Sequence, residues 1–338
     1  MKYKLFGKNS GLFVSEFVLG TGMFGTTSGY GATMEECEKI FNAYSDQGGN
    51  FIDTSDAYQL GQAEEITGKL IVGRRSNYVI ASKYSRGHAL ASTGNIGNHR
   101  KALREGIEAS LKRLKTDYID LYLVHFEDKY TPLEEIVRGM EDLVQSGKVL
   151  YWGLSNFSPW RTAAAATFAK STHRPPLTAI QIEYNLLQRA VEQEYWPLAN
   201  EMGLAIMAYS PMAGGMLTSK YRKGESGRLK QGSGEAIDYK TSSVLDVLET
   251  ISVQTGFSCG QLATAWVRTK GVFPIIGART VEQFAENIRS GLINLSPEQL
   301  EALDEVSQVR RLYPHHIDGQ KILTQNGKIT LDYDTQLK

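Results

Sequence analysis

Four side chains suited to proton transfer lie near the ends of consecutive apolar segments of the chain: Asp53, Tyr58, Lys83 and His125. A tyrosine with an ordinary pKa of about 10 is a poor acid at neutral pH, but a nearby ammonium lowers that pKa by favouring the phenolate. We therefore expect Lys83 to activate Tyr58, and Asp53 to be the counter-charge that keeps a desolvated Lys83 protonated. His125 is then available to hydrogen-bond a substrate carbonyl.

Each of these residues, taken alone, has an ordinary structural explanation. A pair such as Asp53 and Lys83 is more often a structural ion pair between neighbouring strands than part of an active site. Tyr58 is typical of a packing residue in a loop, and His125 is as typical of a hydrogen-bonded core histidine as of a catalyst. The functional interpretation is favoured because all four lie at the same ends of consecutive predicted strands, where barrel enzymes carry their active sites.

The elements that must position these residues follow a regular alternation of strands and helices. Short apolar strands are expected near residues 17–20, 50–53, 78–82, 119–124, 150–154, 179–182, 204–208 and 273–276. Between them lie amphipathic segments such as residues 132–145, whose apolar residues recur at three- and four-residue spacing. Eight alternations without a linker rich in Pro, Ser or Gly predict one α/β domain, a (β/α)8 TIM barrel.

Three segments fall outside this repeat. Residues 2–14 are expected to form a short hairpin ahead of the barrel, which would run from about residue 15 to residue 308. Residues 210–241, after the seventh strand, are glycine-rich and long enough to form a loop over a site. The tail, residues 309–338, contains Asn326-Gly327 between apolar stretches, which predicts a hairpin turn. The whole chain, residues 1–338, is expected to be a single domain.

A doubly wound dinucleotide-binding fold is the alternative. Gly20, Gly22 and Gly25 match the G-x-G-x-x-G pattern, and Asp53 ends the next strand as a ribose-binding acid would. That motif requires the helix to begin within the glycines, so that its N-terminus meets the pyrophosphate. Here residues 26–32 intervene and the first helix-start signal is Thr33, so the barrel is favoured.

A better phosphate site is predicted after the last strand. Arg279 lies at the start of a helix capped by Thr280, where a guanidinium, backbone N–H groups and the helix dipole would act together. A solvated surface arginine is the structural alternative. The histidines show no metal-ligand spacing, and we expect no metal site.

Composition excludes several classes of partner. The 338 residues are 41% hydrophobic and 22% charged, which is typical of a globular protein. Lys+Arg and Asp+Glu each number 37, so no basic field would attract nucleic acid or an acidic membrane. Cys37 and Cys259 have no CxxC spacing, and no signal peptide or membrane span is recognisable, so we expect a cytoplasmic protein. The oligomeric state cannot be read from these features.

Longer motifs show that the chain resembles the aldo-keto reductases, most closely the aryl-alcohol-dehydrogenase-like branch of bacteria and fungi. These motifs are residues 20–25, 50–58, 81–83, 111–125, 147–156, 181–185, 208–211 and 277–279. The resemblance implies a barrel that binds a nicotinamide dinucleotide without a Rossmann fold and reduces aldehydes or ketones by reversible hydride transfer. It implies that Tyr58 is the general acid, with Lys83 and Asp53 as its tuning pair. His125 would orient the carbonyl.

The resemblance also implies cofactor contacts at the later strand ends. Ser155, Asn156 and Gln181 would bind the nicotinamide carboxamide, and Tyr209 would stack on the nicotinamide ring. Ser210, Met212 and Gly214 would lie along the pyrophosphate. Arg279 and Gln283 would face the adenosine phosphate, with Glu286 and Asn287 near the adenine. Some relatives carry a lysine at the position of Gly277 and an arginine at that of Gln283, both cofactor-binding positions. The expected preference for NADP(H), with NAD(H) as a second cofactor, therefore depends on Arg279.

The substrate pocket is expected to be apolar and aromatic, which suits aryl or medium-chain aldehydes. Its candidate wall residues are Met23, Phe24, Tyr30, Tyr84, Phe126 and Trp152. Ordinary packing around the barrel mouth explains them equally well. The alternative function is a cofactor-sensing regulatory subunit similar to potassium-channel β subunits, which share the barrel.

Overall fold

The computed structural model describes residues 1–86, 92, 94–222, 224 and 238–317. The chain divides into two compact units, Met1–Ser307 and Gln308–Lys338. Within the second unit, the described residues include a short 3-10 turn, η6 (His315–Ile317). The hairpin expected at Asn326-Gly327 lies outside the described residues.

The first unit is built on a closed barrel of parallel strands in the order β10-β3-β4-β5-β6-β7-β8-β9. The strands are β3 (Val18–Gly20), β4 (Phe51–Asp53), β5 (Val79–Tyr84), β6 (Ile119–Val124), β7 (Val149–Ser155), β8 (Leu177–Glu183), β9 (Ala205–Tyr209) and β10 (Phe273–Ile276). This arrangement confirms the predicted (β/α)8 TIM barrel. The doubly wound alternative is wrong, because the first helix begins only at Met34, beyond the glycine motif.

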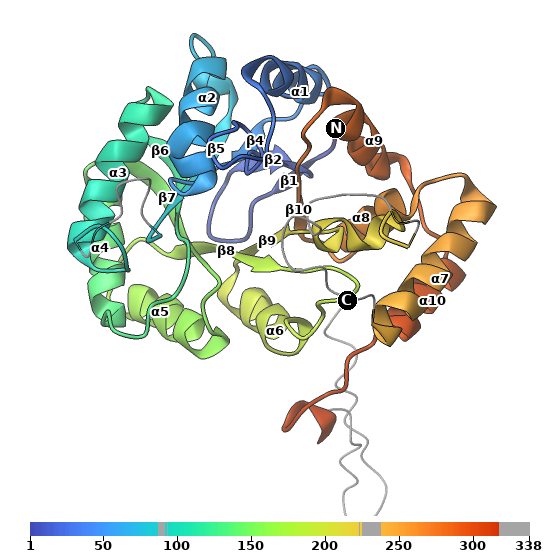
Figure 1. The fold of residues 1–338 in the computed structure, drawn as a ribbon. Helices are drawn as coiled ribbons and strands as arrows, with labels where there is room; N and C mark the ends of the chain where they lie inside the picture. Colours follow the sequence, from blue (N-terminus) through green and yellow to red (C-terminus); the bar gives the residue numbers. More distant parts are fainter. Residues whose placement is uncertain (87–91, 93, 223, 225–237, 318–338) are drawn as a thin grey trace, which may run out of the picture. The chain divides into compact units, whose positions relative to one another are not determined.

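Helices surround the strands, as the ribbon in Figure 1 shows. They are α1 (Met34–Asp46), α2 (Gln62–Leu70), α3 (Arg100–Leu114), α4 (Leu133–Gln145), α5 (Pro159–Ser171), α6 (Glu192–Met202), α7 (Tyr239–Thr255), α8 (Cys259–Thr269), α9 (Val281–Ile288) and α10 (Pro297–Val306). Ser258 and Ser296 begin α8 and α10 with complete capping boxes, in which the serine and a glutamine three residues on satisfy each other's backbone N–H. No helix within the described ranges combines the length and apolar character that crossing a membrane requires.

Successive side chains of each barrel strand point alternately inward and toward the helices. On β5, Val79 and Ala81 belong to the apolar cluster inside the barrel, whereas Ile80 and Tyr84 belong to the layer under the helices. Lys83 continues the inward row at the end of the strand that meets the barrel mouth. The strand period therefore places the lysine in the barrel and its neighbour outside it.

A small antiparallel hairpin, β1 (Tyr3–Leu5) and β2 (Phe13–Ser15), covers the amino ends of the strands, as expected for residues 2–14. The ring of Phe6 lies edge-on to Phe51, with 5.2 Å between ring centroids, and is tilted against Phe273 at 5.3 Å. Because Phe51 and Phe273 are the first residues of β4 and β10, these rings close the bottom of the barrel.

The connection after β9 contains a short helical turn, η3 (Ala213–Thr218), before α7 begins at Tyr239 with Asp238 as its N-cap. This connection is the predicted long loop after the seventh barrel strand. Residues 223 and 225–237 within it lie outside the described part.

Candidate active site

Lys83 is the centre of the site at the carboxyl ends of the strands. Its ammonium has three N–H donors, and they meet Asp53 Oδ2 at 2.7 Å, the Thr54 carbonyl at 2.8 Å and the Tyr58 hydroxyl at 3.1 Å. Lys83 is completely buried, and Asp53 is only 1% exposed. The structure therefore brings the predicted acid, lysine and tyrosine together.

The charge of Lys83 follows from a balance of opposing effects. Burial by itself lowers the pKa of this lysine, but the nearby Asp53 carboxylate and the Tyr58 hydroxyl outweigh burial and raise the pKa above its ordinary value. Lys83 is consequently an ammonium that presents a fixed positive charge to the phenol oxygen.

Tyr58 is positioned by an unusual turn rather than by a strand. It begins η1 (Tyr58–Gly61), in which Gln59 and Leu60 both have left-handed backbone angles, with φ of 50° and 57°. The buried Gln59 side chain donates to the Tyr30 carbonyl at 2.8 Å and accepts from the backbone N–H of Ser28 at 2.9 Å. The loop after β3 and the loop after β4 are thus tied together around Tyr58.

His125, just beyond β6, is a neutral imidazole. Burial lowers its pKa to about 2, and the positive charges of Lys83 and Arg86 act in the same direction. Its ring lies edge-on to Tyr58, with 5.7 Å between ring centroids. Its Nδ1 lies 3.1 Å from the Ser55 hydroxyl, which leaves Nε2 as the nitrogen available to a substrate.

Two amides link the opposite sides of the barrel mouth. Gln181 on β8 donates to Asp53 Oδ1 at 2.7 Å, so both carboxylate oxygens of Asp53 have partners. Asn156, which follows β7, donates to the His125 carbonyl at 3.0 Å and accepts from the Tyr209 hydroxyl at 2.8 Å. The predicted cofactor residues of β7, β8 and β9 therefore lie next to the predicted catalytic residues.

The remaining predicted cofactor residues lie at the same end of the barrel. Ser155 ends β7, Ser210 follows β9, Met212 and Gly214 lie at η3, Gly277 follows β10, and Gln283, Glu286 and Asn287 belong to α9. Asn156 and Ser210 both adopt left-handed backbone angles, with φ of 55° and 54°. Such strained non-glycine residues are typical of ligand sites, where the surroundings hold them in place.

The adenosine end of the predicted site lies at the start of α9, where some backbone N–H groups have partners within the protein. Two backbone N–H groups in the first turn of α9 already have partners, because Glu36 Oε2 accepts from Val281 N at 3.1 Å and the Thr280 hydroxyl accepts from Gln283 N at 3.3 Å. The N–H of Arg279 donates to the Gln283 side chain at 3.0 Å. The backbone contribution to a phosphate site stays a prediction, and the Arg279 side chain is the cation available to it.

The Arg279 guanidinium lies over the Tyr30 ring, 4.3 Å from its centroid. Within the described ranges no carboxylate forms an ion pair with it. Tyr30, predicted as a substrate wall, thus lies beside the predicted phosphate arginine.

Three of the predicted wall residues do not face the barrel mouth. Tyr84 points toward the helices, where it stacks on Tyr122 and donates to the Asn98 carbonyl. Trp152 is also buried in the layer under the helices and donates from its indole to the Pro175 carbonyl at 3.0 Å. Phe24 is completely buried in the same layer. These three assignments are corrected: each ring packs under the helices.

Met23 and Phe126 remain exposed enough to form part of a pocket. Phe126 is 39% exposed, and its ring lies 4.7 Å from that of His125 between centroids. The Arg86 guanidinium lies over the Phe126 ring, 4.8 Å from its centroid. An aromatic ring next to the imidazole is consistent with an aryl-binding surface.

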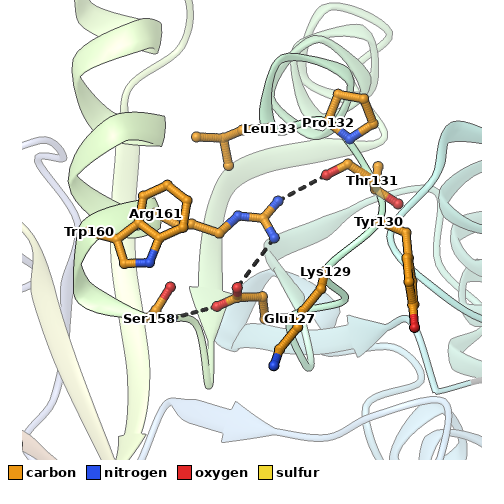
Figure 2. Close-up of a pocket in the computed structure, with 9 residues that line it drawn as sticks. All are labelled: Glu127, Lys129, Tyr130, Thr131, Pro132, Leu133, Ser158, Trp160 and Arg161. Atoms are coloured by element: carbon orange, nitrogen blue, oxygen red, sulfur yellow. Dashed lines mark hydrogen bonds and ion pairs between the residues drawn. The ribbon is translucent and has the colours of Figure 1, made fainter.

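A separate cavity of about 690 Å³ lies beside the loop that follows His125, and none of the four predicted catalytic residues lines it. Figure 2 shows its central interaction, in which Arg161 of α5 contacts both Glu127 and Thr131. Glu127 also accepts from the backbone N–H of Ser158 at 2.6 Å. These contacts fix the loop between β6 and α4 and so support the position of His125.

Two further buried residues of the site, Ser55 and Asp56, were not predicted from the sequence. Both follow Asp53 in the motif that carries Tyr58, and Ser55 contacts His125 directly. Polar residues in an otherwise apolar strand end are the signal that would have found them. Among the described residues, no three His, Cys, Asp or Glu side chains are grouped to hold a metal ion.

Comparisons with known proteins agree with this geometry. The model of the aldo/keto reductase family matches residues 16–308. A putative aryl-alcohol dehydrogenase of Saccharomyces cerevisiae is 32% identical over 94% of this chain and 90% of its own length. An aryl-alcohol dehydrogenase (NADP+) of Phanerodontia chrysosporium is 31% identical over 94% and 89%, and an uncharacterized oxidoreductase of Bacillus subtilis is 35% identical over 90% and 96%. The resemblance read from the sequence is thereby confirmed, and the chain belongs to the aldo/keto reductase family of NAD(P)H-dependent oxidoreductases.

Proposed function

We propose that this chain is an NADPH-dependent carbonyl reductase that acts on aryl aldehydes and, in reverse, oxidises the corresponding alcohols. The observation that carries the proposal is the Lys83 ammonium, whose three donors are shared between Asp53, the Thr54 carbonyl and the Tyr58 hydroxyl. No purely structural ion pair requires a phenol as its third partner.

In this proposal Tyr58 gives its proton to the alkoxide that develops from the carbonyl oxygen. The Lys83 ammonium, 3.1 Å away, stabilises the phenolate that remains, and Asp53 keeps Lys83 charged in its buried position. In alcohol oxidation the same phenolate accepts the proton. The apolar surroundings strengthen each of these interactions relative to water.

His125 is proposed to hold the carbonyl oxygen through an Nε2–H donor. A neutral imidazole suits this role because it donates a hydrogen bond without competing with Tyr58 as an acid. The exposed ring of Phe126 beside it supports an aryl substrate. The names of the fungal relatives, aryl-alcohol dehydrogenases, point to the same class.

The donors at the later strand ends fit a nicotinamide dinucleotide, which supplies the hydride when it is bound. Ser155, Asn156 and Gln181 offer a hydroxyl and two amides to the carboxamide, and Tyr209 offers a ring for stacking. The strained residues Asn156 and Ser210 support a ligand site here. Met212 and Gly214 would lie along the pyrophosphate, with Gly277, Gln283, Glu286 and Asn287 toward the adenosine.

Preference for NADPH over NADH is proposed on the Arg279 guanidinium, which has an aromatic ring beneath it and no carboxylate partner in the described part of the chain. The NADP+ in the name of the Phanerodontia chrysosporium relative supports this choice.

The test is consumption of NADPH and of NADH across aryl aldehydes, aldoses, methylglyoxal and ketones. Tyr58→Phe removes the acid but keeps the ring, and kcat is expected to fall by about 10²- to 10⁴-fold while NADPH affinity is unchanged. The matched control is Tyr84→Phe, which removes the hydroxyl of a buried tyrosine outside the barrel. An active Tyr58→Phe enzyme would defeat the assignment. NADPH binding without turnover of any carbonyl would favour a regulatory subunit instead.

A further inference from the structure

The hydroxyl of Ser55 lies between two titratable groups. Its Oγ is 3.1 Å from His125 Nδ1 and 3.1 Å from Asp56 Oδ1, and it accepts from the backbone N–H of Ala57 at 3.2 Å. Ser55 is completely buried, Asp56 is 2% exposed and His125 is 6% exposed. Water therefore has little access to this chain of three side chains.

Counting hydrogens limits this chain to two arrangements. The Ser55 hydroxyl has one hydrogen to donate and, with Ala57 on one lone pair, one further acceptor site. If Ser55 donates to a carboxylate of Asp56, then it accepts from His125 Nδ1–H and Nε2 has no hydrogen. If Asp56 is protonated and donates to Ser55, then Ser55 donates to His125 Nδ1, and the imidazole hydrogen is on Nε2.

The charges around Asp56 favour its protonated form. Burial and the nearby carboxylate of Glu64 together raise the pKa of Asp56 to about 7, against smaller opposing effects of Ser55 and Arg113. Arg113 is a cation that acts on both acids, and its Nε donates to Glu64 Oε2 at 2.7 Å. Tyr122, packed on the same side, is neutral, since burial raises its pKa.

The groups around His125 do not oppose this arrangement. Lys83 and Arg86 are cations that keep the imidazole neutral, Tyr58 lies edge-on to its ring, and Phe126 covers it. The tautomer of a neutral imidazole is set by the hydrogen bond that its other nitrogen makes. That hydrogen bond is the one to Ser55.

We propose that Ser55 and Asp56 are positioning residues that hold His125 in the tautomer with hydrogen on Nε2, through a relay from a protonated Asp56 by way of the Ser55 hydroxyl. The inference rests on the proposed function, because Nε2–H is the donor that meets the carbonyl there. When Asp56 ionises, the Ser55 hydroxyl donates to Asp56 instead of to His125, and the imidazole hydrogen moves to Nδ1. Carbonyl reduction then loses its donor as the pH rises through the pKa of Asp56.

The first test is the pH profile of kcat/KM for carbonyl reduction. In the wild type, kcat/KM is expected to fall as the pH rises through about 7. Asp56→Asn carries an amide N–H that donates to Ser55 at every pH, so this fall should disappear. Ser55→Ala should lower kcat/KM by about tenfold at low pH, and Ser55→Thr should restore it because it keeps the hydroxyl.

The matched control is Ser15→Ala, which removes a completely buried serine hydroxyl at the other end of the barrel, where it contacts Tyr44. Its expected effect is on stability, with the pH profile of kcat/KM unchanged. A fall near pH 7 that persists in Asp56→Asn would overturn the proposal, and so would a Ser55→Ala profile identical to that of the wild type.

The second test reads the tautomer without turnover. Nitrogen-15 spectra of histidine-labelled wild-type protein, with His125 assigned by its loss in His125→Gln, should show hydrogen on Nε2 at about pH 6 and on Nδ1 at about pH 8.5. A His125 with hydrogen on Nδ1 at the lower pH would overturn the relay even if neither the Ser55 nor the Asp56 variants fold. The expected tautomers in a protein that reduces no carbonyl would support the relay and defeat the proposed function instead.

Discussion

The two ends of the barrel are made from the same strands but from opposite chemistry. Strand β4 shows the contrast over three residues: Phe51 at its start packs against Phe6 inside the barrel, and Asp53 at its end binds Lys83. The lower layer is a cluster of apolar rings and aliphatic side chains. The upper layer contains the ion pair of Asp53 and Lys83, the amide of Gln181 and a histidine, all buried.

This difference separates what stabilises the fold from what the site requires. Burying apolar rings is favourable in itself, at about 25 cal/mol for each Å² removed from water. Burying Asp53 and Lys83 is costly unless each charge has its partner, and an apolar pair of similar size would stabilise the barrel as well or better. The upper layer is therefore explained by chemistry rather than by stability.

Removing Lys83 should have the largest effect, because it should lower both the stability of the barrel and the activity of the site. Lys83→Met leaves the Asp53 carboxylate buried without its cation, so the free energy of unfolding should fall by about 3–5 kcal/mol and turnover should be lost. Chemical denaturation and an NADPH-consumption assay measure the two effects. The double variant Asp53→Leu with Lys83→Met should recover most of the stability and none of the activity. A double variant as unstable as the single one would contradict the separation of the two roles.

Removing Phe6 tests the lower layer. Phe6→Ala opens a cavity between Phe51 and Phe273, so the free energy of unfolding should fall by about 3–5 kcal/mol. The value of kcat/KM, measured well below the melting temperature, should be unchanged. Phe13→Ala on the same hairpin is the control, because Phe13 is 62% exposed and its loss should cost less than about 0.5 kcal/mol. A Phe6→Ala enzyme with a large catalytic defect would show that the two layers are coupled.

Removing Arg279 tests the rim above the upper layer. Arg279→Ala should weaken NADPH binding by about 1.5–3 kcal/mol, the usual contribution of hydrogen bonds to a charged group, and should leave NADH binding unchanged. Quenching of protein fluorescence by each dinucleotide gives the two dissociation constants. Arg289→Ala, an exposed arginine just beyond the other end of α9, is the control. Equal losses for both cofactors would place the guanidinium elsewhere than at the phosphate that distinguishes them.

The fold was predictable because the strand signal is local. All eight barrel strands coincide with predicted apolar segments, and capping residues such as Ser258 and Ser296 mark helix starts without reference to the rest of the chain. The proximity of Asp53, Tyr58 and Lys83 followed from strand ends meeting at one edge. These inferences need only the period of the pattern and the rule for parallel barrels.

Which way each strand residue points, into the barrel or toward the helices, was predicted less well, although the two-residue period of a strand determines it. Lys83 points into the barrel, so its neighbour Tyr84 must point toward the helices, and the assignment of Tyr84 to the pocket was wrong for that reason. The assignment of Trp152 is wrong for the same reason, whereas no local pattern shows that Phe24 is buried in the layer under the helices. The Glu36 contact to α9 joins residues 245 positions apart and has no local signal.

The Glu36 contact leads to the smallest expected effect. Its carboxylate accepts from Val281 N at the start of α9, close to the arginine predicted to bind phosphate, and it also contacts Lys39. A carboxylate at a helix N-terminus is favourable by about 0.3–1 kcal/mol, and it opposes a second anion at the same place by a similar amount. Glu36→Gln keeps an acceptor for the N–H but removes the charge. NADPH should therefore bind about two- to fivefold more tightly, with NADH unaffected.

Glu35→Gln is the matched control, since Glu35 also pairs with Lys39 but is 77% exposed and has no contact to α9 among the described interactions. Tighter NADPH binding in both variants would point to a general effect of charge, and no change in Glu36→Gln would mean that the phosphate lies away from this helix.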